Sequence, residues 1–444
     1  MKDLTKGYPA KVIIMFALPL MIGNILQQLY NITDSKIVSE FVGTGALAAV
    51  GATAVISNTL TGFINGMTQG FGILIARSFG ERDRLMMKKY VAGTIKLTFA
   101  VAVFLTLIGE FFIRNFLMLL KTPGDILDSA TDYVRIIIAG VCFISLYNMC
   151  ANILRAVGDS KRPLVCLFIS VIINIGLDLL FIRVFDWGIK GAAYATIIAQ
   201  AVSGGSCLFF LLHRYGELIP HGKEWSLNGS EYRNMVSVGA SMGLMGCIVN
   251  VGTIVLQSAI NNLGTEYVTA HTAGRRVIDI MMILIYTIGL SMTTYVSQNL
   301  GAGKKDRIRL GIRHALIIDT GIATLLVLFA YTVGDDVVKW VASTDDETIL
   351  SAGIMYIRVG VLFFYILGPL FIMRCSLQGL GKKIIPLVSS GLEMLTKILS
   401  AFILVPALGY FGVTLTEPIS WTIMIIPLIF VYVRWARESV KNAA

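Results

Sequence analysis

Apolar residues form long runs along this chain, and short polar segments separate the runs. A helix that crosses about 30 Å of hydrocarbon needs about 20 predominantly apolar residues. Twelve runs reach that length, and none of the polar segments between them is long enough to form a soluble domain. We therefore predict membrane-spanning helices over residues 12–38, 45–76, 90–119, 130–154, 163–184, 189–212, 235–262, 266–297, 311–341, 350–377, 386–406 and 412–433.

The pattern of the first half returns in the second half. Gly43-Thr44 recurs as Gly264-Thr265, 221 residues later, and a two-residue insertion in a polar loop then changes the offset to 223. The new offset is kept by the pairs Tyr133/Tyr356, Arg135/Arg358, Leu154/Leu377, Gly158/Gly381 and Pro163/Pro386. Internal repeats of this kind are typical of secondary transporters.

Each copy contains six predicted helices, an even number, so both copies should enter the membrane in the same orientation. Such parallel repeats are related by an axis along the membrane normal. We expect an all-α membrane protein whose twelve transmembrane helices form two pseudo-symmetric six-helix bundles. The expected lobes are residues 1–213 and 235–444, and residues 214–234, rich in loop-type residues, form the expected cytoplasmic linker.

Composition and charge agree with a membrane location. Hydrophobic residues make up 56% of the chain and charged residues 14%, with a mean hydropathy of +0.76, whereas soluble domains carry about 25% charge. The net charge of +10 does not indicate a nucleic-acid partner, because the basic residues gather in alternate loops. One set of loops and termini carries 24 Lys and Arg and the opposite set five, so we expect both termini in the cytoplasm.

Enzyme and metal signatures are absent from the sequence. The six cysteines lie singly within apolar stretches, and the four histidines fall in loops or near helix ends without a metal-binding spacing. The chain has no GxxxxGK[ST] motif, so it does not encode direct use of ATP. We expect neither a disulfide nor a bound cofactor, and no enzymatic activity.

Two carboxylates within predicted spans are the strongest candidates for chemistry. Burying an ionisable group at mid-membrane costs about 2.5–3.5 kcal/mol on insertion scales, so such a group is a functional candidate. Asp34 and Asp178 do not repeat, since Val255 and Ala401 stand at the corresponding positions. Each carboxylate shares a helical face with a polar residue four positions earlier, and nearby spans offer further neutral groups: Tyr30, Asn174, Thr196 and Asn148.

This group predicts a carboxylate-rich cavity that binds a proton or a hard monovalent cation. Two structural explanations compete with that hypothesis. Lys36 could neutralise Asp34, although two positions on a helix give poor geometry for an ion pair. Asp178 could instead cap a broken helix.

The second half has polar groups of its own. Glu393 and Lys397 have the i, i+4 spacing of an ion pair, and they could either neutralise each other or form a second site for a cation or a substrate. We interpret the set Arg275, Arg276 and Asp279 as mainly structural. We expect the stripe Gly62, Gly66 and Gly70 to serve close helix packing rather than substrate binding.

These motifs resemble those of the multidrug and toxic compound extrusion (MATE) transporters, which belong to a superfamily that also holds lipid-linked oligosaccharide flippases. The resemblance covers nearly the whole chain. It rests on Leu18-Pro19, Tyr30-x3-Asp34, Gly43-x2-Ala46-Leu47-Ala48-Ala49, Gly158-Asp159 before Pro163, Asn174-x3-Asp178 and Gln298-Asn299-Leu300-Gly301-Ala302-Gly303.

The resemblance implies two six-helix bundles, alternating access, and export of small cationic or amphiphilic compounds driven by inward H+ or Na+. It implies an ion-coupling site at Asp34, Asn174, Asp178 and Thr196, with Tyr30 beside it, and the first four would ligate Na+ if that ion is coupled. The second-lobe acids of the sodium-coupled branch are absent from helices 7 and 10. We expect a monomer in the bacterial inner membrane, surrounded by lipid, and a lipid-linked oligosaccharide flippase is the alternative.

Overall fold

The computed structural model describes residues 3–119 and 122–441, and helices are the only regular secondary structure in these ranges. Ten helices are long and apolar enough to cross a membrane, and two further pairs each form one bent span. The prediction of an all-α membrane protein with twelve spans is confirmed. Lys2 and Lys121, which entered the comparison of loop charges, lie outside the described residues.

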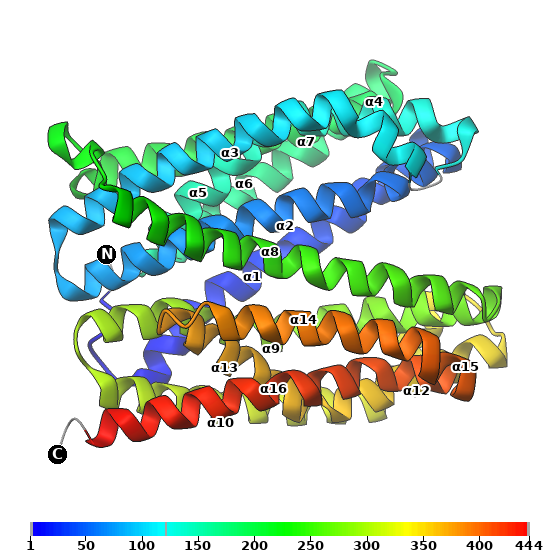
Figure 1. Ribbon diagram of the computed structural model, residues 1–444. Coiled ribbons are helices and arrows are strands. Elements are labelled where there is room, and N and C mark those ends of the chain that lie inside the picture. The colour runs from blue at the N-terminus through cyan, green and yellow to red at the C-terminus, as the bar shows by residue number, and fades with distance from the viewer. Residues whose placement is uncertain (1–2, 120–121, 442–444) are drawn as a thin grey trace. The chain divides into compact units, whose positions relative to one another are not determined.

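The first half of the chain contains one span for each predicted apolar run, of which the fourth is bent and the fifth ends in a π-helical turn. Figure 1 shows these elements in blue to green. They are α1 (Pro9–Phe41), α2 (Thr44–Glu81), α3 (Arg84–Leu119), α4 (Gly124–Ala139), α5 (Val141–Ala156), α6 (Lys161–Asp178), η1 (Leu179–Val184) and α7 (Gly188–Arg214).

The second half follows the same order after two short 3-10 turns, η2 (Gly216–Leu218) and η3 (Gly222–Trp225). The span predicted at 311–341 ends at Thr332, and a separate nine-residue helix follows it. The elements are α8 (Gly229–Asn261), α9 (Thr265–Gly301), α10 (Lys305–Thr332), α11 (Gly334–Ala342), α12 (Glu347–Leu362), α13 (Phe364–Gly379), α14 (Ile384–Leu399), η4 (Ser400–Leu404), α15 (Val405–Leu408) and α16 (Tyr410–Lys441).

The backbone repeats its irregular features at the offsets found in the sequence. The fourth span of each copy bends at one residue, by 45° after α4 and by 52° after α12. The breaks fall at Gly140 and Phe363, which are 223 residues apart. In both copies the following span then loosens into a π-helical segment, η1 or η4.

Two repeated glycine pairs are required by the backbone. Gly43 and Gly264 precede α2 and α9 with φ of 106° and 110°, and Gly158 and Gly381 have φ of 83° and 78°. A side chain with a Cβ rarely adopts such angles, so glycine recurs where each copy makes the same turn. The recurrence in both sequence and backbone supports the internal duplication.

The helices form two compact units, which divide the chain differently from the predicted lobes. The first unit contains Ile22–Gly243, and the second contains Asp3–Met21 together with the residues from Leu244 onward. Each unit therefore takes one part of α1 and one part of α8. A linear sequence gives no sign of this division, because both helices continue through it without a break.

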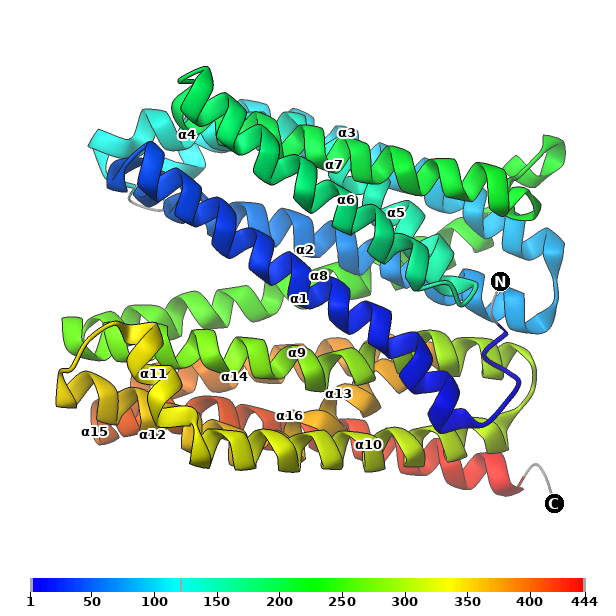
Figure 2. The same ribbon diagram turned by 180° about the vertical axis from the view of Figure 1, so that it is seen from behind.

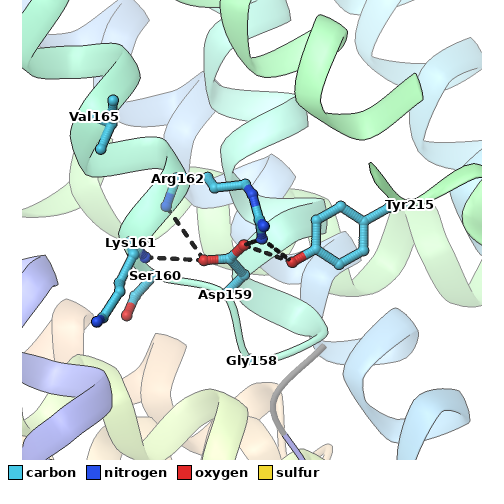
Figure 3. A pocket seen from close by; sticks show the side chains of 7 residues that line it. All are labelled: Gly158, Asp159, Ser160, Lys161, Arg162, Val165 and Tyr215. Atoms are coloured by element: carbon cyan, nitrogen blue, oxygen red, sulfur yellow. Dashed lines mark hydrogen bonds and ion pairs between the residues drawn. The ribbon is translucent and has the colours of Figure 1, made fainter. Parts of the chain in front are cut away.

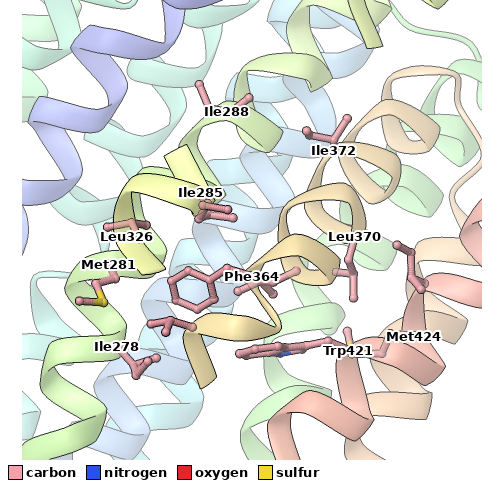
Figure 4. Close-up of a cluster of buried hydrophobic side chains, with 14 of the residues drawn as sticks. Ile278, Met281, Ile285, Ile288, Leu326, Phe364, Leu370, Ile372, Trp421 and Met424 are labelled. Atoms are coloured by element: carbon pink, nitrogen blue, oxygen red, sulfur yellow. The ribbon is translucent and has the colours of Figure 1, made fainter. Parts of the chain in front are cut away.

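Packing within each unit places neighbouring spans side by side. In the first unit α6 and α5 both pack on α7, and α2 packs on α5, whereas in the second unit α13 packs on α9 and α14 on α16. Figures 1 and 2 show these helices running along one another. The core of the second unit includes Ile285 of α9, Leu326 of α10, Phe364 and Leu370 of α13 and Trp421 of α16 (Figure 4).

The segment predicted as a linker is attached to the first unit. Lys88 and Lys89 of α3 form ion pairs of 3.1 Å with Glu224 and Glu231. Lys96 donates to the carbonyl of Trp225 at 2.7 Å and lies over its indole ring. Residues 214–234 therefore fold against α3.

The glycine stripe of α2 permits close packing at two of its three positions. A Cβ built on Gly66 would lie 2.5 Å from the carbonyl oxygen of Met242, and one built on Gly70 would lie 3.0 Å from that of Val238. Nothing lies within 4 Å of a Cβ at Gly62. Gly66 and Gly70 thus let the first part of α8 approach α2, as expected for small residues at a helix contact.

We predict that Gly66→Ala lowers the thermal stability of the purified protein and that Gly62→Ala does not. Overpacking of this kind typically costs about 1–3 kcal/mol, whereas alanine at an open helical position gains up to about 1 kcal/mol relative to glycine. Thermal unfolding in detergent would measure both variants. An equal effect at the two positions would contradict the close contact of α2 with α8.

Candidate functional site

Three spans of the first unit bring the predicted ion-coupling residues together. Asp34 lies on α1, Asn174 and Asp178 lie one turn apart on α6, and Thr196 lies on α7. The hydroxyl groups of Tyr30 and Thr196 form a hydrogen bond of 3.2 Å, which links α1 to α7. The four-residue spacing of each pair places both of its members on one helical face.

The two carboxyl groups of this site face each other without compensation. Asp178 is fully buried and Asp34 is 9% exposed. The groups are close enough to interact electrostatically, and no described lysine or arginine acts on either of them. Neither oxygen of Asp178 has a hydrogen-bond partner, nor does Oδ1 of Asp34. Two ionised carboxylates in this arrangement would repel each other in a medium that screens charge poorly.

Asn174 adds a neutral polar group to the same interior. Its side chain is fully buried, and neither its amide nitrogen nor its carbonyl oxygen has a partner. Buried polar groups are normally paired with protein or water. Unpartnered oxygens of Asp34, Asn174 and Asp178 together form a donor set that suits a proton or a monovalent cation.

The structural explanations for the two aspartates find no support in the described contacts. Lys36 is exposed and forms no ion pair with Asp34 among these residues. Asp178 stands at the junction between α6 and η1, and its side chain accepts no capping hydrogen bond there. Rare π-helical turns within α-helices are frequent at functional sites.

Tyr133 of α4 is a neighbour of the site that the candidate list lacks. It is buried, and its hydroxyl group is close enough to interact electrostatically with both Asp34 and Asp178. The repeat contained a signal for it, because Tyr133 and Tyr356 correspond. Tyr356 adjoins Arg275, Asp279 and Glu417 in the second unit, so each tyrosine borders the buried polar group of its own unit.

Asn148 does not join the carboxylates in a hydrogen-bonded group. Its amide nitrogen donates to the carbonyl oxygen of Ile144 in its own helix, α5, at 2.9 Å. Asparagine side chains in helices often satisfy themselves in this way. The structure therefore does not unite Asn148 with either set of candidate residues.

The second unit contains a chain of buried ion pairs in which cations and anions alternate. Lys397 lies between Glu393 at 3.0 Å and Glu417 at 3.2 Å, and Arg275 joins Glu417 at 3.0 Å to Asp279 at 2.8 Å. Arg374 lies 3.7 Å from the far oxygen of Glu393. Three cations and three anions give this network no net charge.

Sequence reasoning identified four members of this network and missed Glu417 and Arg374. The pair Glu393 and Lys397 is present, and Thr253 of α8 accepts a further hydrogen bond from Lys397 at 3.2 Å. Glu417 is an acid within the last apolar run, so the rule that selected Asp34 could also have selected it. Arg276 is exposed and forms none of these ion pairs.

A pocket of about 270 Å³ lies at the turn between α5 and α6 (Figure 3). Asp159 accepts from the hydroxyl of Tyr215 at 2.6 Å, from the backbone nitrogens of Lys161 and Arg162, and from the Arg162 guanidinium. Burial alone would raise the pKa of Asp159, but the bonds from Tyr215 and Arg162 outweigh it and hold the pKa below the ordinary value. The cluster closes the turn and caps α6.

A metal centre built from acidic, histidine and cysteine side chains is not found in the described ranges. No group of three or more such residues there could hold a metal ion. The site at Asp34 and Asp178 instead combines two acids with neutral oxygens, a set with room for a transported cation.

Comparisons with known proteins agree with the fold and with its duplication. The family model described as MatE matches residues 19–180 and 242–403, two segments that are separated by the 223-residue offset of the repeat. The chain is 26% identical over 386 residues to the "Probable multidrug resistance protein YpnP" of Bacillus subtilis, covering 87% of this chain and 86% of the relative. It is 23% identical over 423 residues to the "Multidrug export protein MepA" of Staphylococcus saprophyticus, covering 92% of this chain and 89% of the relative.

A solved structure has the same fold over nearly the whole chain. Its title is "Outward-facing conformation of a multidrug resistance MATE family transporter of the MOP superfamily". It matches with a TM-score of 0.91 and 23% sequence identity, and the match covers 99% of this chain and 98% of the solved one.

We predict opposite effects of neutralising a carboxylate in the two units. Glu417→Gln should destabilise the protein by about 3–5 kcal/mol, because it leaves Lys397 and Arg275 buried with uncompensated charge. Asp178→Asn should leave the stability equal or raise it, because it removes one of two repelling charges. Thermal unfolding at neutral pH would compare them, and a loss for Asp178→Asn as large as that for Glu417→Gln would contradict the uncompensated pair.

A third prediction concerns pH and the Asp159 cluster. Since the folded-state pKa of Asp159 lies below its ordinary value of 3.8, its ionised form stabilises the fold above that pH and the contribution disappears as the pH falls through the folded value. Tyr215→Phe should cost about 1 kcal/mol at neutral pH, and the difference from wild type should shrink on acidification. A difference that is independent of pH would show that Tyr215 acts only through packing.

Proposed function

The chain belongs to the MatE family, and on this premise we propose that it is a multidrug efflux transporter that exports small cationic or amphiphilic compounds in exchange for inward H+ or Na+. The family and the relatives that are named for multidrug resistance and export make it a transporter rather than an enzyme. Exchange by alternating access is our extension to this chain.

The observation that carries the ion-coupling proposal is the uncompensated pair Asp34 and Asp178. A site that lacks any cation of its own can hold one that is transported. A single proton shared by the two carboxyl groups would replace their repulsion with a hydrogen bond. Na+ would require further oxygen ligands, which Asn174 and Thr196 could supply.

The cycle follows from what this pair does in each state. Binding of an inward-moving cation at Asp34 and Asp178 removes their negative charge and with it their attraction for a cationic substrate. An inward cation gains about 2.3 kcal/mol per 100 mV of membrane potential, which is enough to bias an exchange. A ligand shifts a conformational equilibrium only by its differential affinity for the two states, and the loss of repulsion is such a difference.

We further propose that the protein lies in the bacterial inner membrane with both termini in the cytoplasm. The support for this orientation is the excess of Lys and Arg in alternate loops. Lys88, Lys89, Arg162, Lys304 and Arg307, on the side proposed to be cytoplasmic, engage carboxylates or backbone carbonyl groups of the described chain.

The flippase alternative receives no support from the second unit. A pyrophosphate group would need a cavity with excess positive charge. Arg275, one of the two adjacent arginines, is already neutralised by Asp279 and Glu417, and Arg374 is neutralised by Glu393. We therefore retain export of cationic compounds as the function.

The test is uptake of a fluorescent cation by proteoliposomes under a pH gradient alone and then under a Na+ gradient alone. We expect one of these gradients to drive transport by the wild type, and Asp34→Asn to lose that dependence. Coupling free energies between sites are about 1–3 kcal/mol, so the loss should be about 5–150-fold. Asp178→Asn should behave alike.

Asp128→Asn is the matched control, because Asp128 is an exposed acid that pairs with Arg114 outside the site. It should transport as well as the wild type does. Gradient-driven transport by Asp34→Asn at the wild-type rate would show that the coupling role assigned to the pair is wrong.

A further inference from the structure

A third buried carboxyl group lies in the second unit, away from the ion-pair network. Asp319 is in the middle of α10 and is 1% exposed. Neither of its oxygens has a hydrogen-bond partner among the described residues. Its isolation separates it from Glu393, Glu417 and Asp279, each of which has a cationic partner.

The carboxyl group of Asp319 is packed directly against the backbone of α13. A Cβ built on Gly368 would overlap both carboxyl oxygens, so only glycine leaves room for Asp319 in this packing. The next residue, Pro369, lies within the helix. Because proline has no amide hydrogen, the carbonyl group of Tyr365, four residues earlier, lacks its helical donor.

The surroundings of Asp319 contain no charge that could balance it. The helices that pack on α10 are α9, α11, α12 and α13. Their ionisable side chains include Asp279 and Arg374, which belong to the network, Arg358 and Asp335, which pair with each other at 2.9 Å, and Tyr365, which bonds Thr324 at 2.9 Å. None of the described ionisable groups acts electrostatically on Asp319.

The neighbouring side chains are apolar on several of these helices. Figure 4 shows Ile285 and Ile288 of α9, Leu326 of α10, and Phe364 and Leu370 of α13 in the core of this unit. An ionised carboxylate buried among such residues without a partner is strongly unfavourable, and the group is then neutralised by a proton.

We propose that Asp319 is a proton-binding site of the second unit and that it carries its proton whenever α13 is packed against α10 at Gly368. A proton needs only one oxygen, whereas a metal cation needs several ligands, and Gly368 occupies the space where those would have to lie. The protonated carboxyl group also supplies a donor to the stretch of α13 that Pro369 deprives of one.

Release of this proton requires α13 to separate from α10, since only then can water reach the carboxylate. The contact lies within two turns of Phe363, where α12 and α13 meet at 52°. Proton binding at Asp319 is thereby linked to the packing of the bent span. The inference goes beyond the proposed function and does not depend on which ion drives export.

The first experiment is infrared spectroscopy of the full-length protein, in which a protonated carboxyl group has a carbonyl stretch distinct from that of a carboxylate. The background is Asp34→Asn combined with Asp178→Asn, which removes the other two uncompensated acids. At neutral pH we expect one protonated carboxyl band per protein, and its complete loss on adding Asp319→Asn. Asp306→Asn, at an exposed position of α10, should keep the band.

Asparagine matches the shape of a protonated aspartate, so Asp319→Asn should fold, and size-exclusion chromatography would verify this. If the combined background fails to fold, the wild type and Asp319→Asn alone give the same difference spectrum. A spectrum in which Asp319→Asn removes no protonated band overturns the proposal. Loss of the band on replacing choline chloride with sodium chloride also overturns it, in favour of a Na+ site.

The second experiment tests the link to α13 by hydrogen exchange. With the intrinsic pH dependence of exchange subtracted, peptides from α13 in the wild type should exchange faster as the pH is raised to alkaline values, and those in Asp319→Asn should not change. Peptides from α6 in the first unit serve as an internal control. Equal pH dependence in the two proteins overturns the link between the proton and the packing of α13.

Discussion

Charge balance inside the membrane-spanning bundles is the constraint on which the rest of this structure depends. An ionised side chain that leaves water must find an opposite charge, several hydrogen bonds or a bound ion. The second unit meets this condition with six side chains that alternate in sign, from Arg374 to Asp279. The first unit does not meet it, because Asp34 and Asp178 have no cation. That deficit is the physical reason for assigning ion binding to the first unit.

The two copies share a backbone and differ in the charges placed on it. Both have a break in the fourth span, a π-helical turn after the fifth, and glycines with positive φ at the same turns. Lys397 occupies the position that corresponds to Asn174, so one copy holds a cation where the other leaves an unpartnered amide. Tyr133 and Tyr356 border both arrangements. Duplication thus supplied a common scaffold, and substitutions at a few buried positions gave each copy a different electrostatic role.

Much of the candidate site could be predicted because intramembrane charge is rare and i, i+4 spacing defines a helical face. Asp34, Asn174 and Asp178 were found in this way, as was the pair of Glu393 with Lys397. Glu417, Arg374 and Asp319 obey the same rule but were passed over, since single polar residues in apolar runs have no local partner to draw attention to them. Their importance follows from neighbours on other helices, and those neighbours are 24 to 142 residues away in the case of Glu393 and Glu417. The sequence contains these residues without indicating which of them meet.

The sequence by itself determined the number of spans, the repeat and its offset, and the residues that carry charge into the membrane, because each of these is written in local composition and periodicity. Only the tertiary structure decided how that charge is compensated. It also decided that α1 and α8 are each divided between two compact units, and that residues 214–234 fold against α3. The reason is that compensation and packing depend on distances between helices, and helix periodicity fixes the face of a side chain but not the partner that the face will meet.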